Sequence, residues 1–178
     1  MYNEAGMQHE LALYLRQQIG DKYIIRLEYP IGSAGISERL AKKEMDIYLQ
    51  HRTTGKKYCI ELKHTQGRSV PNRMFQAFTD VLFLEQLKEH GFDKGFLLFF
   101  TNGSRFWQEG QKARTLYQYF RGDRVTFSAL YKTDDIQEFI SKKTDNKILI
   151  PLKHTYAAKW QDFMHNTVNG WRYFIVEL

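Results

Sequence analysis

The sequence predicts an α/β fold with the element order helix, three strands, helix, strand. Two observations predict this order. Apolar residues recur at helical spacing near the start of the chain and again after residue 71. Between these two helices lie three strand-like segments that are bounded by turn residues. The 178 residues fit one domain, with a core of about 3–102 and an α/β extension of about 103–178.

The elements of the core follow from local patterns. Gly20 and Gly91 end the two helices, Pro71 opens the second one, and the Thr53–Gly55 turn joins two strands into a hairpin. The segment 95–100 is almost entirely hydrophobic, so we expect a strand that is covered on both faces. The predicted order is helix 3–19, strand 23–29, polar loop 31–42, strands 46–51 and 57–63, helix 71–90 and strand 95–100.

The extension carries weaker patterns. Thr133 and the two aspartates after it are typical of a helix N-terminus. The sequence predicts a strand at 125–131, a short helix at 133–141, an extended segment at 148–152, a helix at 157–165 and a final strand at 171–176.

Charge and composition limit the classes of function. Lys and Arg number 26 and Asp and Glu 20, so the formal net charge is +6, which favours a polyanionic partner. A basic protein with no such partner fits the charge equally well. One cysteine excludes an intrachain disulfide. The chain has no pattern of a signal peptide or membrane span, so we expect a cytoplasmic protein with no membrane partner.

Two carboxylates are predicted to face each other on the hairpin. If its centre lies between Thr53 and Thr54, Asp46 is opposite Glu61, because 46 + 61 equals 53 + 54. Their Cβ atoms would then lie ~4.5–5.5 Å apart on one face. Lys63 shares that face, whereas Ile47, Leu49, Ile60 and Leu62 point to the other.

This arrangement suits metal-assisted phosphodiester hydrolysis. Opposed carboxylates repel each other, and a divalent cation would offset the repulsion. Mg²⁺ typically binds one or two carboxylates together with water and substrate phosphate. A nearby ammonium group can orient the attacking water or stabilise charge on phosphorus. The alternative is a solvated strand on which Glu and Lys alternate, and a one-residue slip would turn Asp46 to the other face.

The element order, with Asp46 on the second strand and Glu61-Leu62-Lys63 on the third, resembles the PD-(D/E)XK nuclease superfamily, which has the restriction endonuclease-like fold. The resemblance covers about residues 3–102. It implies that Asp46 and Glu61 are metal ligands, that Lys63 is the lysine of the motif, and that the Leu62 carbonyl is a further ligand. It also implies Mg²⁺ as cofactor, with Mn²⁺ as a substitute. One departure is that Asp46 follows Met45 rather than proline.

Further residues are candidates for the site through the same resemblance. Several branches carry a metal-binding glutamate on the first helix, for which Glu10 is the candidate and Glu4 the weaker alternative. Gln76 on the second helix and Glu44 beside Asp46 are candidates for support of the site. A solvated charge on the helix explains Glu10 equally well, and an ordinary exposed polar side chain is the favoured explanation of Gln76. The basic residues expected to contact nucleic acid are Arg39, Lys42, Lys43, Arg68 and Arg73.

The function expected from these features is that of a metal-dependent DNA endonuclease resembling restriction enzymes. Many members of the superfamily cut both strands as dimers, so the resemblance allows a homodimer. A Holliday-junction resolvase or a DNA-repair nuclease is an alternative with the same chemistry. From another class, the alternatives are a nucleic-acid-binding module without catalysis and an interaction subunit of a larger complex.

Overall fold

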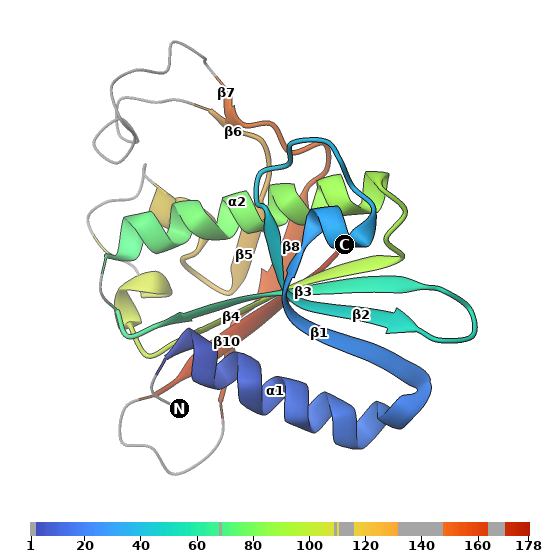
Figure 1. Cartoon of the computed structure of the whole chain (residues 1–178). Helices are drawn as coiled ribbons and strands as arrows, with labels where there is room; N and C mark the ends of the chain where they lie inside the picture. The colour runs from blue at the N-terminus through green and yellow to red at the C-terminus, as the bar shows by residue number, and fades with distance from the viewer. Residues whose placement is uncertain (1–2, 68, 109, 111–115, 132–147, 164–169) are drawn as a thin grey trace.

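The computed structural model describes residues 3–67, 69–108, 110, 116–131, 148–163 and 170–178. Their main element is a six-stranded mixed sheet with the strand order β1-β2-β3-β4-β10-β9. Helix α1 (Glu4–Ile19) lies on one face of this sheet and helix α2 (Val70–Glu89) on the other (Figure 1). None of the described helices is long and apolar enough to span a bilayer.

Helix α1 leads into an antiparallel meander, as the sequence predicts. The Asn3 side chain caps α1 by accepting a hydrogen bond from the Gly6 N–H at 2.8 Å. Gly20, with φ of +56°, ends it in a conformation that favours glycine. The meander consists of β1 (Tyr23–Pro30), β2 (Glu44–His51) and β3 (Lys57–Thr65).

The register of the β2–β3 hairpin is the predicted one. Backbone pairs run from Gln50↔Lys57 to Ile47↔Ile60, so paired residue numbers sum to 107, as do 46 and 61. Gly55 adopts φ of +73° in the turn, and its N–H donates to the His51 carbonyl. The face that carries the two acids also carries Tyr48 and Cys59, which are buried under α2.

Helix α2 connects β3 to β4 (Lys94–Thr101), which is parallel to β3. This connection places α2 over the face of the sheet that carries Asp46, Glu61 and Lys63. The prediction that the 95–100 segment is covered on both faces is confirmed. Phe99 is buried in the cluster that includes α2, whereas Phe100 is buried in the cluster that includes α1.

The two faces of the sheet carry cores of different composition. The core beneath α1 is aliphatic for the most part and includes Met7, Leu49 and Leu62. The core beneath α2 is larger and rich in aromatic rings, among them Phe78, Phe99 and Phe174. Described segments of the extension contribute to this second core, so α2 packs between the sheet and these segments.

The extension differs from its predicted form. The predicted final strand 171–176 is confirmed as β10 (Arg172–Glu177). It pairs antiparallel with β4. The predicted helix 157–165 is wrong where the structure describes it, because these residues form β8 (Tyr156–Lys159) and β9 (Gln161–Asp162). Ala158 and its neighbours alternate inward and outward, a strand period that the helix propensity of alanine concealed.

The remaining elements are short. The predicted strand 125–131 divides into β5 (Arg124–Phe127) and β6 (Leu130–Tyr131), which pair with β8 and with β7 (Ile148–Ile150). The predicted helix 133–141 lies outside the described residues. Four 3₁₀ turns complete the described elements: Gly20–Lys22, Ile31–Ala34, Ser104–Phe106 and Leu116–Tyr119.

Candidate active site

Asp46 and Glu61 lie next to each other, just beyond the last backbone pair of β2 and β3. Here the two strands are joined by hydrogen bonds from backbone N–H groups to carboxylates. The Asp46 N–H donates to Glu61 Oε1 at 3.3 Å, and the Leu62 N–H donates to Asp46 Oδ2 at 2.7 Å. The Asp46 carboxylate therefore takes the place of a backbone acceptor for β3. Glu61 is fully buried, while Asp46 remains partly exposed.

Two lysines, Lys42 and Lys63, form ion pairs with these two acids and with a third acid, Asp80 of α2. The Lys42 ammonium contacts Glu61 Oε2 directly and lies 3.4 Å from both Asp46 Oδ1 and Asp80 Oδ1. The Lys63 ammonium lies 3.0 Å from Asp80 Oδ2 and donates to the Leu62 carbonyl at 3.1 Å. Asp80 thus bridges the two ammonium groups. We call Asp46, Glu61, Asp80, Lys42 and Lys63 the acid–lysine cluster.

Glu4, in the first turn of α1, joins this cluster from the other side. Its Oε1 lies 3.8 Å from the Lys63 ammonium, and its Oε2 accepts a hydrogen bond from the His64 N–H at 3.0 Å. Gln8, one turn later, donates its amide N–H groups to the Asp46 carbonyl and to Glu28 Oε1, each at 2.6 Å. Both helices therefore hold side chains against the ends of β2 and β3.

Burial alters the protonation of the cluster. Burial and the neighbouring Asp46 and Asp80 carboxylates raise the pKa of Glu61 to about 8, although Lys42 opposes the shift. Burial also raises the pKa of Asp80, against the effect of Lys63 and Lys42. Burial alone would lower the pKa of Lys63, but Asp80 and Glu4 outweigh it and raise that pKa. Both ammonium groups therefore stay charged at neutral pH.

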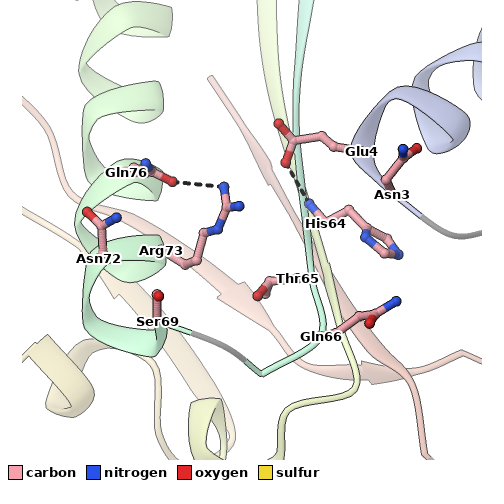
Figure 2. Close-up of a pocket in the computed structure, with 9 residues that line it drawn as sticks. All are labelled: Asn3, Glu4, His64, Thr65, Gln66, Ser69, Asn72, Arg73 and Gln76. Atoms are coloured by element: carbon pink, nitrogen blue, oxygen red, sulfur yellow. Dashed lines mark hydrogen bonds between the residues drawn. The ribbon is translucent and has the colours of Figure 1, made fainter.

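A polar cavity of about 410 Å³ opens beside the cluster, between the first turns of α1 and α2 (Figure 2). Its lining is polar or charged throughout: Asn3, Glu4, His64, Thr65, Gln66, Ser69, Asn72, Arg73 and Gln76. A second cavity of about 490 Å³ shares Glu4, Asn72, Arg73 and Gln76 with the first and reaches Lys42, Lys63 and Asp80. The two cavities adjoin, so a ligand in the first lies next to the acid–lysine cluster.

The structure brings some of the predicted residues together and not others. Asp46, Glu61, Lys63 and the Leu62 carbonyl meet as expected. Glu10 does not join them, because its side chain is exposed and lies 3.8 Å from His9. Glu4 occupies the position expected for a glutamate of the first helix. Gln76 lines both cavities and accepts a hydrogen bond from Arg73 at 3.0 Å, whereas Glu44 is exposed on β2 opposite Pro30.

Of the basic residues predicted to contact nucleic acid, some lie at the cavities or the cluster and others lie on the exposed loop. Arg73 lines both cavities, and Arg39 and Lys43 are exposed on the loop before β2. Lys42 differs from its neighbours, because its ammonium is directed into the cluster rather than to solvent. Arg68 lies outside the described residues.

Asp80 and Gln8 were missed by the sequence analysis. A signal for Asp80 was present, since it is a charged residue three positions after Ala77 and four before Leu84, both buried on the inner face of α2. A charge in such a stripe requires a buried partner. Gln8 carried no comparable signal, because a glutamine on an amphipathic helix is ordinarily exposed.

Fold and site together define an α/β protein with a six-stranded mixed sheet and an acid–lysine cluster at the ends of β2 and β3, beside a polar cavity. Comparison with family models, curated proteins and solved structures finds no match to this chain. The geometry of the site therefore carries the functional argument.

Proposed function

We propose that this protein is a metal-dependent DNA endonuclease that hydrolyses phosphodiester bonds. One observation carries the proposal. Asp46 and Glu61 face each other on adjacent strands. Lys63 follows Glu61 by two residues on the same face of β3, and its side chain lines a polar cavity. The same order of elements and the same three residues underlie the resemblance to the PD-(D/E)XK superfamily.

The residues present fit a divalent cation. No group of three or more His, Cys, Asp or Glu side chains within the described ranges is arranged as a metal site by itself. Mg²⁺ does not require one, since it commonly takes one or two carboxylates and completes its shell with water and substrate phosphate. The Lys42 ammonium lies among the carboxylates of Asp46, Glu61 and Asp80, so these acids already surround one cation.

In the proposed reaction, Asp46, Glu61 and the Leu62 carbonyl would hold Mg²⁺ or Mn²⁺. When bound, such an ion polarises a phosphoryl oxygen and lowers the pKa of a coordinated water. Lys63 donates a hydrogen bond to the phosphate or to the attacking water, and Asp80 keeps its ammonium in place. The water oxygen bonds to phosphorus and loses a proton to solvent, one phosphorus–oxygen ester bond breaks, and the departing sugar oxygen takes up a proton from solvent.

Charge and cavity support a nucleic acid as substrate. The net charge is +6, and Arg39 and Lys43 are exposed on the loop that leads to Asp46. Arg73 provides a cation within the polar cavity, and the amides of Asn72 and Gln76 provide hydrogen-bonding groups beside it. A strand whose phosphate meets the acid–lysine cluster would place its neighbouring nucleotide in this cavity.

Cleavage assays test the proposal directly. Supercoiled plasmid and linear, flapped and four-way-junction DNA are incubated with Mg²⁺, Mn²⁺ or EDTA. Asp46→Asn and Lys63→Met should each lower metal-dependent cleavage by about 10²–10³-fold, because Lys63→Met removes the ammonium that stabilises the developing negative charge and Asp46→Asn removes a ligand of the metal that does so. Lys88→Met is the matched control, since it removes one exposed lysine of α2. Equal cleavage by Lys63→Met and the control would exclude the proposed site.

A second candidate is a nucleic-acid-binding module that does not cleave. The observation in its favour is that Lys42 and Lys63 already neutralise the acids, so the cluster is stable without a metal. This candidate predicts salt-dependent binding without cutting under any metal condition. Preferential cutting of four-way junctions or flaps would instead identify a resolvase or a repair nuclease.

A further inference from the structure

Lys42 occupies an unusual position for a loop lysine. Its side chain is one-quarter exposed, yet its ammonium contacts carboxylates from three different elements: Asp46 of β2, Glu61 of β3 and Asp80 of α2. Lys43, the next residue, is exposed. The side chain of Lys42 therefore brings a positive charge to the point where the three acids converge.

The three acids require such a charge. The side chains of Glu61 and Asp80 are 0% and 3% exposed, so water cannot solvate both as anions. A divalent cation could supply this positive charge in place of the ammonium, but Lys42 stands between the carboxylates that would bind the ion.

The two lysines are held in different ways. Lys63 lies within β3, is buried, and is fixed by Asp80 and by the Leu62 carbonyl. Lys42 lies in the loop before β2. Hydrogen bonds hold the backbone of the residues on either side of it. The Ala41 N–H donates to Gln86 Oε1 at 2.8 Å, and the Lys43 carbonyl accepts from the Ile31 N–H at 2.9 Å. Withdrawal of the Lys42 side chain from the acids would therefore not require its backbone to move.

We propose that Lys42 is a built-in counter-ion that occupies the metal position of the metal-free protein and must withdraw before a divalent cation binds between Asp46 and Glu61. Lys42 thereby sets the metal affinity of the site. This inference rests on the metal site of the proposed function. Because Lys42 also lines the 490 Å³ cavity, its displaced ammonium would lie where a substrate phosphate enters, so metal and substrate would bind cooperatively.

Direct measurement of Mn²⁺ binding tests this inference without an activity assay. Electron paramagnetic resonance counts free Mn²⁺ in titrations of the wild type, Lys42→Met and Lys43→Met without nucleic acid. We expect Lys42→Met to bind Mn²⁺ at least about tenfold more tightly than the wild type, because a positive charge beside the ion is gone. Lys43→Met removes an equal charge at the adjacent exposed residue and should bind Mn²⁺ like the wild type.

Two further variants keep the test decisive. Lys42→Gln retains an amide donor for Glu61 and replaces Lys42→Met if thermal melts show that the methionine variant is unfolded. Asp46→Asn identifies the site and should abolish Mn²⁺ binding in the wild-type and in the Lys42→Met background. A larger rise in melting temperature with Mn²⁺ for Lys42→Met than for the wild type would also support the inference.

The outcomes separate this inference from the proposed function. If Lys42→Met and the wild type bind Mn²⁺ equally, or if the variant binds more weakly, Lys42 is not a counter-ion that the metal displaces, and the metal site itself stands. If Asp46-dependent Mn²⁺ binding is absent from every variant, both the inference and the metal-dependent function fail.

Discussion

Two buried acids of α2, Asp80 and Glu85, are five residues apart and are neutralised in different ways. Asp80 lies between the ammonium groups of Lys42 and Lys63. Glu85 instead accepts hydrogen bonds from the Lys153 and His154 N–H groups and from the Tyr156 hydroxyl, at 2.8–3.1 Å. Both acids are at most 5% exposed.

The difference separates a structural clamp from the proposed active site. The donors to Glu85 are two backbone groups and one hydroxyl, which hold residues 153–156 against α2 and offer no displaceable charge. The partners of Asp80 are long, cationic side chains that can exchange one anion for another. A buried acid on a helix thus says little about function until its partners are known.

The largest effect should come from breaking the clamp. Glu85→Ala leaves three donors unsatisfied, so we expect the free energy of unfolding to fall by about 3 kcal/mol in urea titrations. Glu89→Ala is the control. The exposed Glu89 carboxylate lies near the same end of the helix and forms an ion pair with the Lys153 ammonium, an interaction of the kind that contributes little to stability. Cleavage per folded molecule should not change in either variant. A Glu85→Ala variant as stable as Glu89→Ala would contradict the clamp.

The pH dependence of stability should distinguish the acid–lysine cluster from the clamp. The pKa of Glu61 is raised from 4.5 to about 8 on folding, so the folded protein binds more protons than the unfolded chain between these values. The free energy of unfolding should therefore fall as pH rises from about 5 to 8 without metal. Glu61→Gln should reduce this slope and leave the part that comes from Asp80, whose pKa is also raised by burial. An unchanged slope in the variant would assign it to other groups.

Asp80→Asn should sharpen the contrast between the two acids. The substitution keeps the shape of the side chain but removes the charge that positions Lys63, so we expect cleavage to fall by about tenfold, a loss of about 1.4 kcal/mol. The alkaline limb of the pH–rate profile should move to lower pH, because Asp80 raises the pKa of Lys63. Glu85→Gln is the matched control on the same helix. An unmoved alkaline limb would rule out a positioning role for Asp80.

The smallest effect should come from the α1 side of the site. Gln8→Met removes the hydrogen bonds to the Asp46 carbonyl and to Glu28, with an expected loss of about 1 kcal/mol in stability. Glu28 has a φ of +47°, which is uncommon for a residue other than glycine, and the bond from Gln8 helps to hold it there. Gln17→Met, on the exposed face of α1, serves as control. Identical denaturation midpoints for the two variants would contradict this role.

Local patterns predicted most of the core. The hairpin register followed from the position of the turn and from the alternation of Ile47 and Leu49 with Asp46, because a strand places successive side chains on opposite faces. The extension was harder to predict. Tyr156–Lys159 is short and contains two alanines, and its strand form depends on pairing with β5, thirty residues earlier in the chain.

The site could be predicted only where its residues lie on one hairpin. The sequence favoured Glu10 over Glu4 because Glu10 borders the apolar stripe of α1. Which end of that helix meets the carboxylates depends on how α1 crosses the sheet, and that crossing brings Glu4 to Lys63.

The amino-acid sequence was enough to predict the order of the core elements, the face shared by Asp46, Glu61 and Lys63, and the basic charge, since these depend on neighbours along the chain or across one turn. Tertiary structure decided that Asp80 bridges two lysines, that Lys42 is directed into the cluster, and that Glu85 clamps the C-terminal segment. These contacts join residues up to 71 positions apart. Their energies come from burial and charge pairing, which exist only after the helices pack on the sheet.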